Sequence, residues 1–397
     1  MTNNFQFSAI FLLLTSFIIQ ESNAASSYST FDVINFGAKP DGRTDSTQPF
    51  LRAWSLACSS IRPAIVSVPR GSFLVTSVAF SGPCKNKVTL NIVGTILAPM
   101  EYWKLGNSGY WILFYKVNRL TINGGTLDAR GAAFWACPKT HKTCPPGARS
   151  ISFVRCGNLV VSGLRSINSQ LFHIAIDESN DILLQNLRIM APSWSPNTDG
   201  VHTQASTGIT IQRSIISTGD DCISLGPGSR NTWIERIACG PGHGISIGSL
   251  GSSRYEDGVE NVTVIGSVFS RTQNGVRIKS WARPSNGFVR DIQFRNLIMN
   301  FVDNPIIIDQ NYCPHGSKTC PNQSSGVKIR GVTYKNIKGT SGTNVAINLG
   351  CSSANPCQGI KLQDIKLTYR YGAPRSYCAN AHGTSSGFVI PASCLSR

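Results

Sequence analysis

The sequence has few charged residues and, beyond its N-terminal segment, no long hydrophobic run. Asp, Glu, Lys and Arg make up only 14% of the 397 residues. No later segment approaches the roughly 18 uninterrupted apolar residues that a transmembrane helix needs, and no low-complexity stretch or linker marks a domain boundary. These absences predict a soluble mature protein with one continuous body. A chain of this length exceeds the usual globular domain, but a solenoid, whose core grows along one axis, escapes that limit.

The extreme N-terminus also lacks something, because residues 1–6 contain no Lys or Arg. An apolar run from Phe7 to Ile19 follows, and then the small-x-small pattern of residues 22–24. This order is typical of a cleaved export signal, and the run is too short to span a bilayer comfortably. We therefore expect residues 1–24 to be a signal peptide and residues 25–397 to form a secreted protein that has no membrane contact after cleavage.

Acidic residues are scarce relative to basic ones. The formal charge is +17, and removal of the signal takes away only Glu21, so the mature chain carries 37 − 19 = +18. Such an excess predicts a polyanionic partner. The basic residues are scattered and no RNA- or DNA-binding motif is present, so nucleic acid is disfavoured. An acidic polysaccharide fits both the charge and the export signal, although a charge that serves solubility alone is the competing explanation.

Paired CxxC motifs are missing, which disfavours a structural zinc site. The 13 cysteines of an exported chain instead predict disulfides, with one thiol unpaired. Pairs close in sequence are Cys58–Cys84, Cys137–Cys144, Cys222–Cys239, Cys313–Cys320, Cys351–Cys357 and Cys378–Cys394. They leave Cys156, which we expect to be a buried small hydrophobe. Asn261 and Asn322 begin N-glycosylation sequons.

A short strand pattern with apolar residues at alternating positions recurs from Asn158 onward. Its starts are Asn158, Asp181, Gly208, Asn231, Asn261, Asp291, Gly326 and Gly359, which are 23, 27, 23, 30, 30, 35 and 33 residues apart. A constant strand with turns of variable length predicts successive coils of a solenoid. No helical pattern separates these strands, so a doubly wound α/β fold is disfavoured.

A helix is expected only near the start of the mature chain. Asp45 or Ser46 can cap it, and apolar residues at helical spacing follow at Phe50, Leu51, Trp54 and Leu56 or Ala57. Such a helix can cover the exposed edge of the first coil. The fold prediction is an all-β, single-domain parallel β-helix with a short N-terminal capping helix.

A second strand follows the first in each repeat, and it carries the polar motifs. Aligning its starts places Asp199, Asp221, His243 and Asn274 at one position; 221 − 199 and 243 − 221 are both 22. Positions +2 and +4 are mostly apolar and predicted to face inward, whereas +3 and +5 are predicted to face outward. Parallel coils lie about 4.8 Å apart, so the aligned residues should form a ladder along the outside. Asp220 falls one residue before this ladder, so the backbone must bend near Gly219 for Asp220 to join it.

The ladder offers the groups that hydrolysis of a glycosidic bond requires. An acid must protonate the leaving oxygen, and an ionised carboxylate must activate water or attack carbon. Asp199, Asp220 and Asp221 lie close enough for like charges to raise at least one pKa. Arg277 and Lys279 alternate across Ile278 and offer a fork and a point charge to a carboxylate. Taken singly, each aspartate beside glycine could be a turn residue and His243 could be structural.

Four motifs in order, Asn197-Thr198-Asp199, Gly219-Asp220-Asp221, Gly242-His243-Gly244 and Arg277-Ile278-Lys279, resemble those of the plant polygalacturonases of glycoside hydrolase family 28. The resemblance covers essentially the whole mature chain. It implies a right-handed parallel β-helix and inverting hydrolysis of α-1,4 bonds in polygalacturonate, the de-esterified backbone of pectin, in the plant cell wall. The implied hydrolysis needs no metal and no other cofactor, and we expect the protein to be a monomer.

By this resemblance Asp220 is the general acid, and Asp199 with Asp221 binds and activates the attacking water. His243 assists, while Arg277, Lys279 and Asn197 bind substrate. The usual separation of inverting carboxyl pairs, about 6.5–9.5 Å, exceeds the spacing of neighbouring coils, so spacing alone does not predict inversion. Two alternatives stay open: a pectate lyase whose aspartates hold calcium, and a non-catalytic pectin-binding protein of the cell wall.

Overall fold

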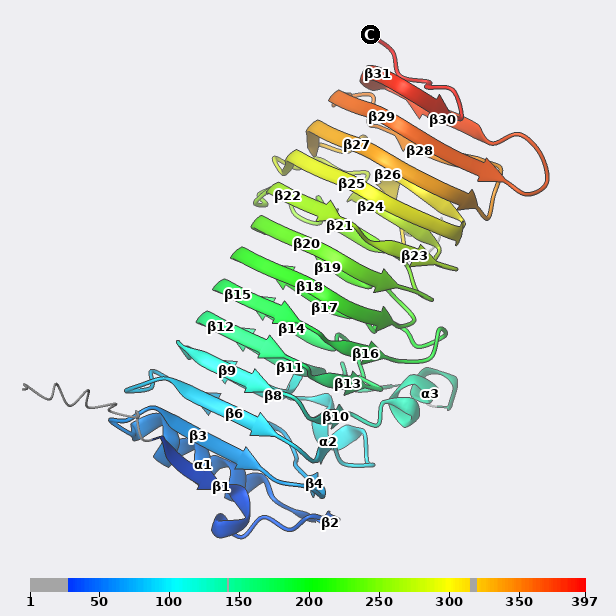
Figure 1. Cartoon of the computed structure of the whole chain (residues 1–397). Helices are drawn as coiled ribbons and strands as arrows, with labels where there is room; N and C mark the ends of the chain where they lie inside the picture. The colour runs from blue at the N-terminus through cyan, green and yellow to red at the C-terminus, as the bar shows by residue number, and fades with distance from the viewer. Residues whose placement is uncertain (1–27, 141–142, 315–319) are drawn as a thin grey trace, which may run out of the picture.

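The chain folds into a long parallel β-helix, shown in Figure 1 as a stack of coils running from β1 to β31. This computed structural model describes residues 28–140, 143–314 and 320–397. The predicted signal peptide, residues 1–24, lies outside them. Every pairing between the described strands is parallel, so each coil stacks directly on the one before it, for example β12 on β15 and β15 on β18. The fold class predicted from the repeats is confirmed.

Two sheets form the walls of the helix. The eleven-stranded sheet contains β5 (Val78–Ser81), β8 (Tyr110–Tyr115), β11 (Arg149–Val154), β14 (Ile174–Asp177), β17 (Val201–Gln204), β19 (Ile223–Leu225), β21 (Ile245–Leu250), β24 (Asn274–Trp281), β26 (Asn304–Tyr312), β28 (Val345–Gly350) and β30 (Arg375–Ala379).

The twenty-stranded sheet wraps the remaining sides of the coils. It contains β1 (Ser29–Asp32), β2 (Asp41–Asp45), β3 (Ala64–Val68), β4 (Ser72–Leu74), β6 (Val88–Ile92), β7 (Thr95–Leu97), β9 (Leu120–Asn123), β10 (Thr126–Asp128), β12 (Gly157–Ser162), β13 (Arg165–Ile167), β15 (Asn180–Gln185), β16 (Arg188–Met190), β18 (Thr207–Ser217), β20 (Arg230–Cys239), β22 (Val259–Ile265), β23 (Val268–Ser270), β25 (Phe288–Val302), β27 (Lys328–Ser341), β29 (Cys357–Tyr369) and β31 (Ala381–Ile390).

Left-handed backbone conformations mark the start of the repeated strand. The φ angles of Asn158, Asp181, Gly208, Asn231, Asn261, Asp291, Gly331 and Gly359 lie between 51° and 68°. Asn, Asp and Gly tolerate this conformation best, which explains why they recur there. One predicted start is wrong: Ile292 pairs with Val332, so the seventh repeat begins at Gly331 and not at Gly326. The motif Gly-Val followed by alternating apolar residues occurs at both places, and only the pairing separates them.

The core lies between the walls and is built from stacked side chains. In the eleven-stranded sheet Val201, Ile223, Ile245, Val276 and Ile306 are in register and fully buried. Burial of each such side chain stabilises the fold by about 1.5–3 kcal/mol. The predicted inward face of positions +2 and +4 is therefore confirmed.

Helix α1 (Thr47–Ser59) covers the first coils, as predicted. Ser46 is the N-cap residue but its side chain makes no capping bond. The carboxylate of Asp45 instead accepts from the backbone N–H of Thr47 at 2.9 Å. Trp54 packs against Phe80 with ring centroids 5.0 Å apart. Of the two apolar alternatives at the end of the pattern, Ala57 is buried and Leu56 is exposed. Sequence periodicity missed two short helices, α2 (Trp103–Gly106) and α3 (Ala132–Thr140), and a 3-10 turn, η1 (Val33–Phe36).

All six predicted disulfides are present, and Cys156 is the free, buried thiol of the described residues. None of the described helices is both long enough and apolar enough to cross a membrane.

Candidate active site

The sequence-predicted residues come from four consecutive coils of the eleven-stranded sheet. Asn197 and Asp199 precede β17, Asp220 and Asp221 precede β19, and His243 precedes β21. Arg277 and Lys279 lie within β24. The coils stack in the predicted register, since Val201 pairs with Ile223, Ile223 with Ile245 and Ile245 with Val276. The hydrogen bond from Gly200 N–H to Asp221 O, 2.9 Å long, extends this register into the motifs.

Asp221 is buried beneath the surface of the groove and is held by two cations. One carboxylate oxygen accepts from Arg277 Nη2 at 2.9 Å, and the other accepts from Lys279 Nζ at 2.8 Å. The hydroxyl of Ser246 also donates to it, at 2.7 Å. Burial alone would raise the pKa of Asp221, but Lys279 and Arg277 outweigh it and lower the pKa to about 2. Asp221 is therefore a fixed anion.

Asp199 has the opposite environment, although it lies on the adjacent coil. Its side chain is buried, and the described structure gives it one side-chain donor, the hydroxyl of Ser224, at 2.5 Å. Burial raises the pKa of Asp199 well above its ordinary value, and the negative charges of Asp220 and Asp221 raise it further. The expectation that crowding would raise at least one aspartate pKa is met, and the raised pKa belongs to Asp199.

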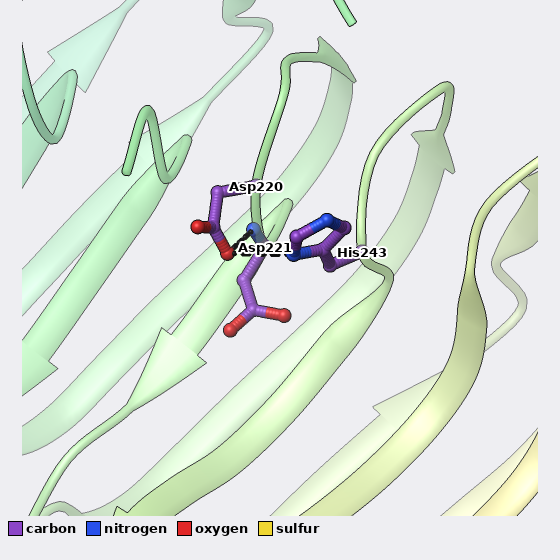
Figure 2. Close-up of side chains that lie close together, drawn as sticks. All are labelled: Asp220, Asp221 and His243. Carbon is purple, nitrogen blue, oxygen red and sulfur yellow. Dashed lines mark hydrogen bonds and ion pairs between the residues drawn. The ribbon is translucent and has the colours of Figure 1, made fainter. Parts of the chain in front are cut away.

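Asp220 and His243 form the accessible part of the cluster (Figure 2). His243 Nδ1 lies 3.0 Å from Asp220 Oδ1, and the two side chains are 36% and 19% exposed. The chain is not in a strand at residues 218–222, and Asp220 Oδ1 accepts from the backbone N–H of Asp221 at 2.7 Å. This departure from strand geometry is the bend that the sequence required near Gly219. Gly219 permits it because a Cβ there would lie 2.0 Å from Ser195 O.

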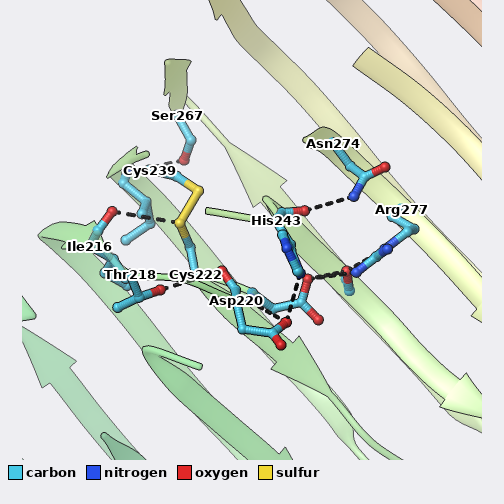
Figure 3. The surroundings of a disulfide bond; sticks show 12 residues. Ile216, Thr218, Asp220, Cys222, Cys239, His243, Ser267, Asn274 and Arg277 are labelled. Atoms are coloured by element: carbon cyan, nitrogen blue, oxygen red, sulfur yellow. Dashed lines mark hydrogen bonds and ion pairs between the residues drawn. A yellow bond between two sulfur atoms is a disulfide. The ribbon is translucent and has the colours of Figure 1, made fainter. Parts of the chain in front are cut away.

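A disulfide fixes the spacing of these coils (Figure 3). Cys222, which follows Asp221, is bonded to Cys239 at the end of β20, just before the Gly242-His243-Gly244 turn. The hydroxyl of Thr218 donates to Asp220 O, at 3.3 Å. On the far side, Asn274 Nδ2 donates to His243 O at 3.0 Å. The turn that carries Asp220 is joined to the turn that carries His243 by the hydrogen bond from His243 N–H to Asp220 O, 2.8 Å long.

A cleft of about 710 Å³ opens beside the cluster. It is lined by polar side chains from five coils, namely Asn197, Asp220, His243, Gln273, Asn274, Arg277, Asn304, Asp309, Asn311 and Tyr312, together with Ile307, Cys313 and Pro314. Asp199, Asp221 and Lys279 do not line it. The cluster therefore has an accessible layer and a buried layer beneath it.

The ladder is thus correct in its alignment, but most of its side chains do not face outward as predicted. The aligned residues share one side of the β-helix, but the carboxylates of Asp199 and Asp221 are covered, and Arg277 and Lys279 are each only 7% exposed. The two cations that were expected to point at substrate bind Asp221. Their predicted contact with substrate stays a prediction.

Three contributors were not singled out from the sequence. Ser224 and Ser246 were noted only as small polar residues of the outward face, yet each donates to the aspartate of the preceding coil. The ring of Tyr312 lies 5.1 Å from Lys279 Nζ and 5.8 Å from the guanidinium carbon of Arg277. Period-two alternation could have placed the serines beside the aspartates, but nothing in the sequence marks Tyr312.

Asp220, Asp221 and His243 have possible metal-ligand atoms within 4.8 Å of one another. Both oxygens of Asp221 already contact a cation. A divalent ion would therefore be repelled at close range by Arg277 and Lys279, so the donor set fits a metal poorly. The expectation of a metal-free site stays a prediction.

Comparison with known proteins identifies the family. The family described as Glycosyl hydrolases family 28 matches residues 58–394. A polygalacturonase of Prunus persica is 52% identical over 389 residues, which cover 98% of this chain and 99% of that relative. An exopolygalacturonase of Platanus acerifolia is 43% identical and covers 92% of this chain and 98% of its own length.

Solved structures share the fold at lower identity. An endo-xylogalacturonan hydrolase from Aspergillus tubingensis superposes with a TM-score of 0.79 at 22% identity, covering 92% of this chain and all of that one. An exopolygalacturonase from Thermotoga maritima gives 0.72 at 20% identity, covering 85% of this chain and 86% of its own. The parallel β-helix, the four motifs and these matches agree, and the chain belongs to glycosyl hydrolase family 28.

Proposed function

We propose that the protein hydrolyses the α-1,4-galacturonosyl bonds of polygalacturonate, by acid–base catalysis that inverts the anomeric centre. The observation that carries the proposal is the cluster of three aspartates on adjacent coils, in which Asp220 lines the cleft and Asp221 is held as an anion by two buried cations. Relatives named polygalacturonases at 52% and 43% identity support the substrate, as does the net charge of +17.

In this proposal Asp220 donates the proton to the leaving glycosidic oxygen. It is the one aspartate of the three that lines the cleft, and His243 lies within hydrogen-bond distance of it. Asp221, held as an anion, accepts a hydrogen bond from the attacking water, and Asp199 orients that water from the neighbouring coil. The water oxygen bonds to the anomeric carbon as the glycosidic bond breaks, and the proton that the water loses returns to the aspartate cluster.

Inversion is supported by the family and not by spacing. Candidate ligand atoms of Asp220 and Asp221 lie within 4.8 Å of each other, which is closer than the roughly 6.5–9.5 Å that is usual for inverting pairs. Analysis of the first-formed anomer by NMR tests this point separately: inversion yields the β-anomer from an α-linked substrate, and an initial α-anomer would contradict it.

Substrate binding in the cleft is assigned to Asn197, Arg277 and Lys279. Arg277 and Asn197 line the cleft directly. Lys279 contributes its charge from beneath, beside the ring of Tyr312. The positive charge is screened by salt, so affinity for polygalacturonate is expected to fall as ionic strength rises.

We also infer that the protein acts outside the cell, in plant cell-wall modification, as a secreted monomer. The N-terminal sequence pattern and the disulfides support export. A relative named polygalacturonase and one named exopolygalacturonase both match the chain, so the proposal covers internal and terminal cleavage alike.

Product analysis over time on polygalacturonate tests the proposed activity. Saturated reducing ends that form equally well with chelator present are expected, and early mixed oligomers would indicate internal cleavage whereas galacturonic acid alone would indicate terminal cleavage. Unsaturated products that require calcium would instead support the lyase. The cations on both oxygens of Asp221 disfavour that alternative. Absence of any product, with binding retained, would support the non-catalytic protein.

A further inference from the structure

The row of residues that contains the catalytic candidates continues past them toward the N-terminus. Ile174 pairs with Val201, which places Phe172 in the row with Asp199, and Ile151 pairs with Ile174, which places Arg149 beside Phe172. Figure 1 shows the strands concerned, β11 and β14, stacked directly before β17. The eleven-stranded sheet therefore carries a cation two coils before Asp199.

Contacts join Arg149 to the active site through one continuous set of side chains. The Arg149 guanidinium lies over the Phe172 ring, 5.7 Å from its centroid. The Phe172 ring packs on the His202 ring with centroids 4.6 Å apart and an interplanar angle of 31°. His202 Nδ1 lies 2.8 Å from Ser224 Oγ, and that hydroxyl donates to Asp199. The aromatic surface is thus held in a fixed position relative to the aspartates.

Arg149 differs from the two cations of the aspartate cluster in being available. Arg277 and Lys279 are buried and bound to Asp221. Arg149 is exposed, and among the described residues it has no carboxylate partner within ion-pair distance. Burial raises the pKa of Asp177, and the charge of Arg149 opposes this rise by electrostatic attraction from beyond ion-pair distance. A free guanidinium above an aromatic ring offers a planar pair of donors and an apolar surface together.

We propose that Arg149 and Phe172 form an additional sugar-binding subsite, N-terminal to the aspartates, that recognises a carboxylated sugar residue of the polymer. This inference rests on the proposed function, because it assumes that a uronate polymer occupies the groove. The guanidinium binds the uronate carboxylate through two charge-assisted hydrogen bonds. The Phe172 ring packs against the apolar face of the sugar ring.

The position of the subsite fits an extended polymer. The coils of Arg149 and Arg277 are separated by five coil steps, through the coils of Phe172, Asp199, Asp221 and His243. At a coil spacing of about 4.8 Å the two arginines lie about 24 Å apart along the axis of the β-helix. Cations thus flank the aspartate cluster on both sides, and a chain of uronate residues can contact both while its scissile bond lies at Asp220.

The neighbouring histidine does not compete for the carboxylate. Burial, together with the charge of Arg149, lowers the pKa of His202 to about 4. At mildly acid pH His202 is therefore neutral and serves as a ring against which Phe172 packs. Arg149 is left as the cation of this subsite.

The test measures binding of oligogalacturonates of increasing length by calorimetry, in an Asp220→Asn background that prevents turnover. Arg149→Gln is expected to weaken binding of long oligomers about fivefold, the upper range for an exposed charge pair, and to weaken short ones less. Arg149→Lys should restore only part of the affinity, because an ammonium cannot form the planar pair. Phe172→Leu tests the ring. Arg165→Gln is the matched control, since Arg165 is exposed on the twenty-stranded sheet.

Each outcome decides one question. Equal affinities of Arg149→Gln and its parent for every oligomer would overturn the subsite while leaving the proposed function intact. An equal loss with Arg165→Gln would mean that net charge alone is responsible, which also overturns it. If the parent protein binds no oligogalacturonate of any length and the wild type releases no product, the proposed function itself fails.

Discussion

The two sheets of the β-helix differ in which of their outward-facing side chains are exposed to solvent. On the twenty-stranded sheet Trp233 is 42% exposed, whereas on the eleven-stranded sheet Lys279 is only 7% exposed. This reverses the usual preference, which buries tryptophan and exposes lysine. The same coils and the same period-two alternation build both faces. Burial of charged side chains on the eleven-stranded sheet alone therefore indicates a functional site. Removing charged groups from water is costly unless they are paired with one another in a well-defined geometry.

The largest effect is expected from Asp220→Asn, with Asp291→Asn on the opposite sheet as its control. Loss of a positioned general acid should lower the rate on polygalacturonate about 10²–10⁴-fold. Asp291 is exposed and has a φ of 56°, which Asn tolerates, so its substitution should leave the rate unchanged. Initial rates of reducing-end release provide the measurement. A loss of less than tenfold in Asp220→Asn would contradict the assignment of the acid.

Lys279→Gln should be the most destabilising single change on the site face. It leaves the buried Asp221 with Arg277 as its remaining cation, and breaking a buried ion pair costs about 3 kcal/mol. Lys361→Gln, an exposed lysine of β29, should change the free energy of unfolding by less than about 0.5 kcal/mol. Urea denaturation of both variants compares the faces directly. Equal midpoints would mean that the buried pair adds nothing.

Stability should also depend on pH through Asp199. Because its folded-state pKa is raised, the folded protein binds this proton more tightly than the unfolded chain, and the resulting stability is lost as pH rises from about 4 through the raised pKa. The cost is about 1.4 kcal/mol per pH unit in that window. Melting curves of wild type and Asp199→Asn across this range should run together at low pH and diverge as pH rises, because only the wild type loses stability there. Parallel curves would show that Asp199 is ionised in the folded state.

The smallest effect concerns the left-handed residues of the twenty-stranded sheet. Asn158 has a φ of 51°, so Asn158→Ala should destabilise the protein by about 1 kcal/mol relative to Asn158→Gly. Thermal denaturation of the two variants isolates the backbone contribution. Equal stability would imply that the coil start relaxes to another conformation.

Much of the fold followed from the sequence because each coil repeats the same local rule. The alternation in Val201 and its equivalents determined which side chains are buried, and the 22-residue spacing of Asp199, Asp221 and His243 placed them in register. The error at Gly326 arose because residues 326–329 repeat the Gly-Val signal, and only hydrogen bonding with β25 identifies Gly331 as the start.

The sequence predicted which residues would gather on these coils, but not how their side chains are arranged. Periodicity specifies the side of the coil on which Arg277 and Lys279 lie, but not whether those long side chains reach outward or turn back across two coils to Asp221. Long flexible side chains have many rotamers, and the choice among them depends on charges contributed by other coils. Because the pKa of each aspartate also depends on charges from other coils, the sequence could not show which aspartate would have the raised pKa.

The left-handed residue at the start of each coil also allows the turns to vary in length while the pairing of the strands stays the same. The interval between successive starts ranges from 231 − 208 = 23 to 331 − 291 = 40 residues, yet the strands after each start remain paired. Insertions and deletions in the turns can therefore alter the walls of the groove while its floor keeps its register. A family with this fold can change which polymers bind, and from which end, while the positions of its catalytic residues stay the same.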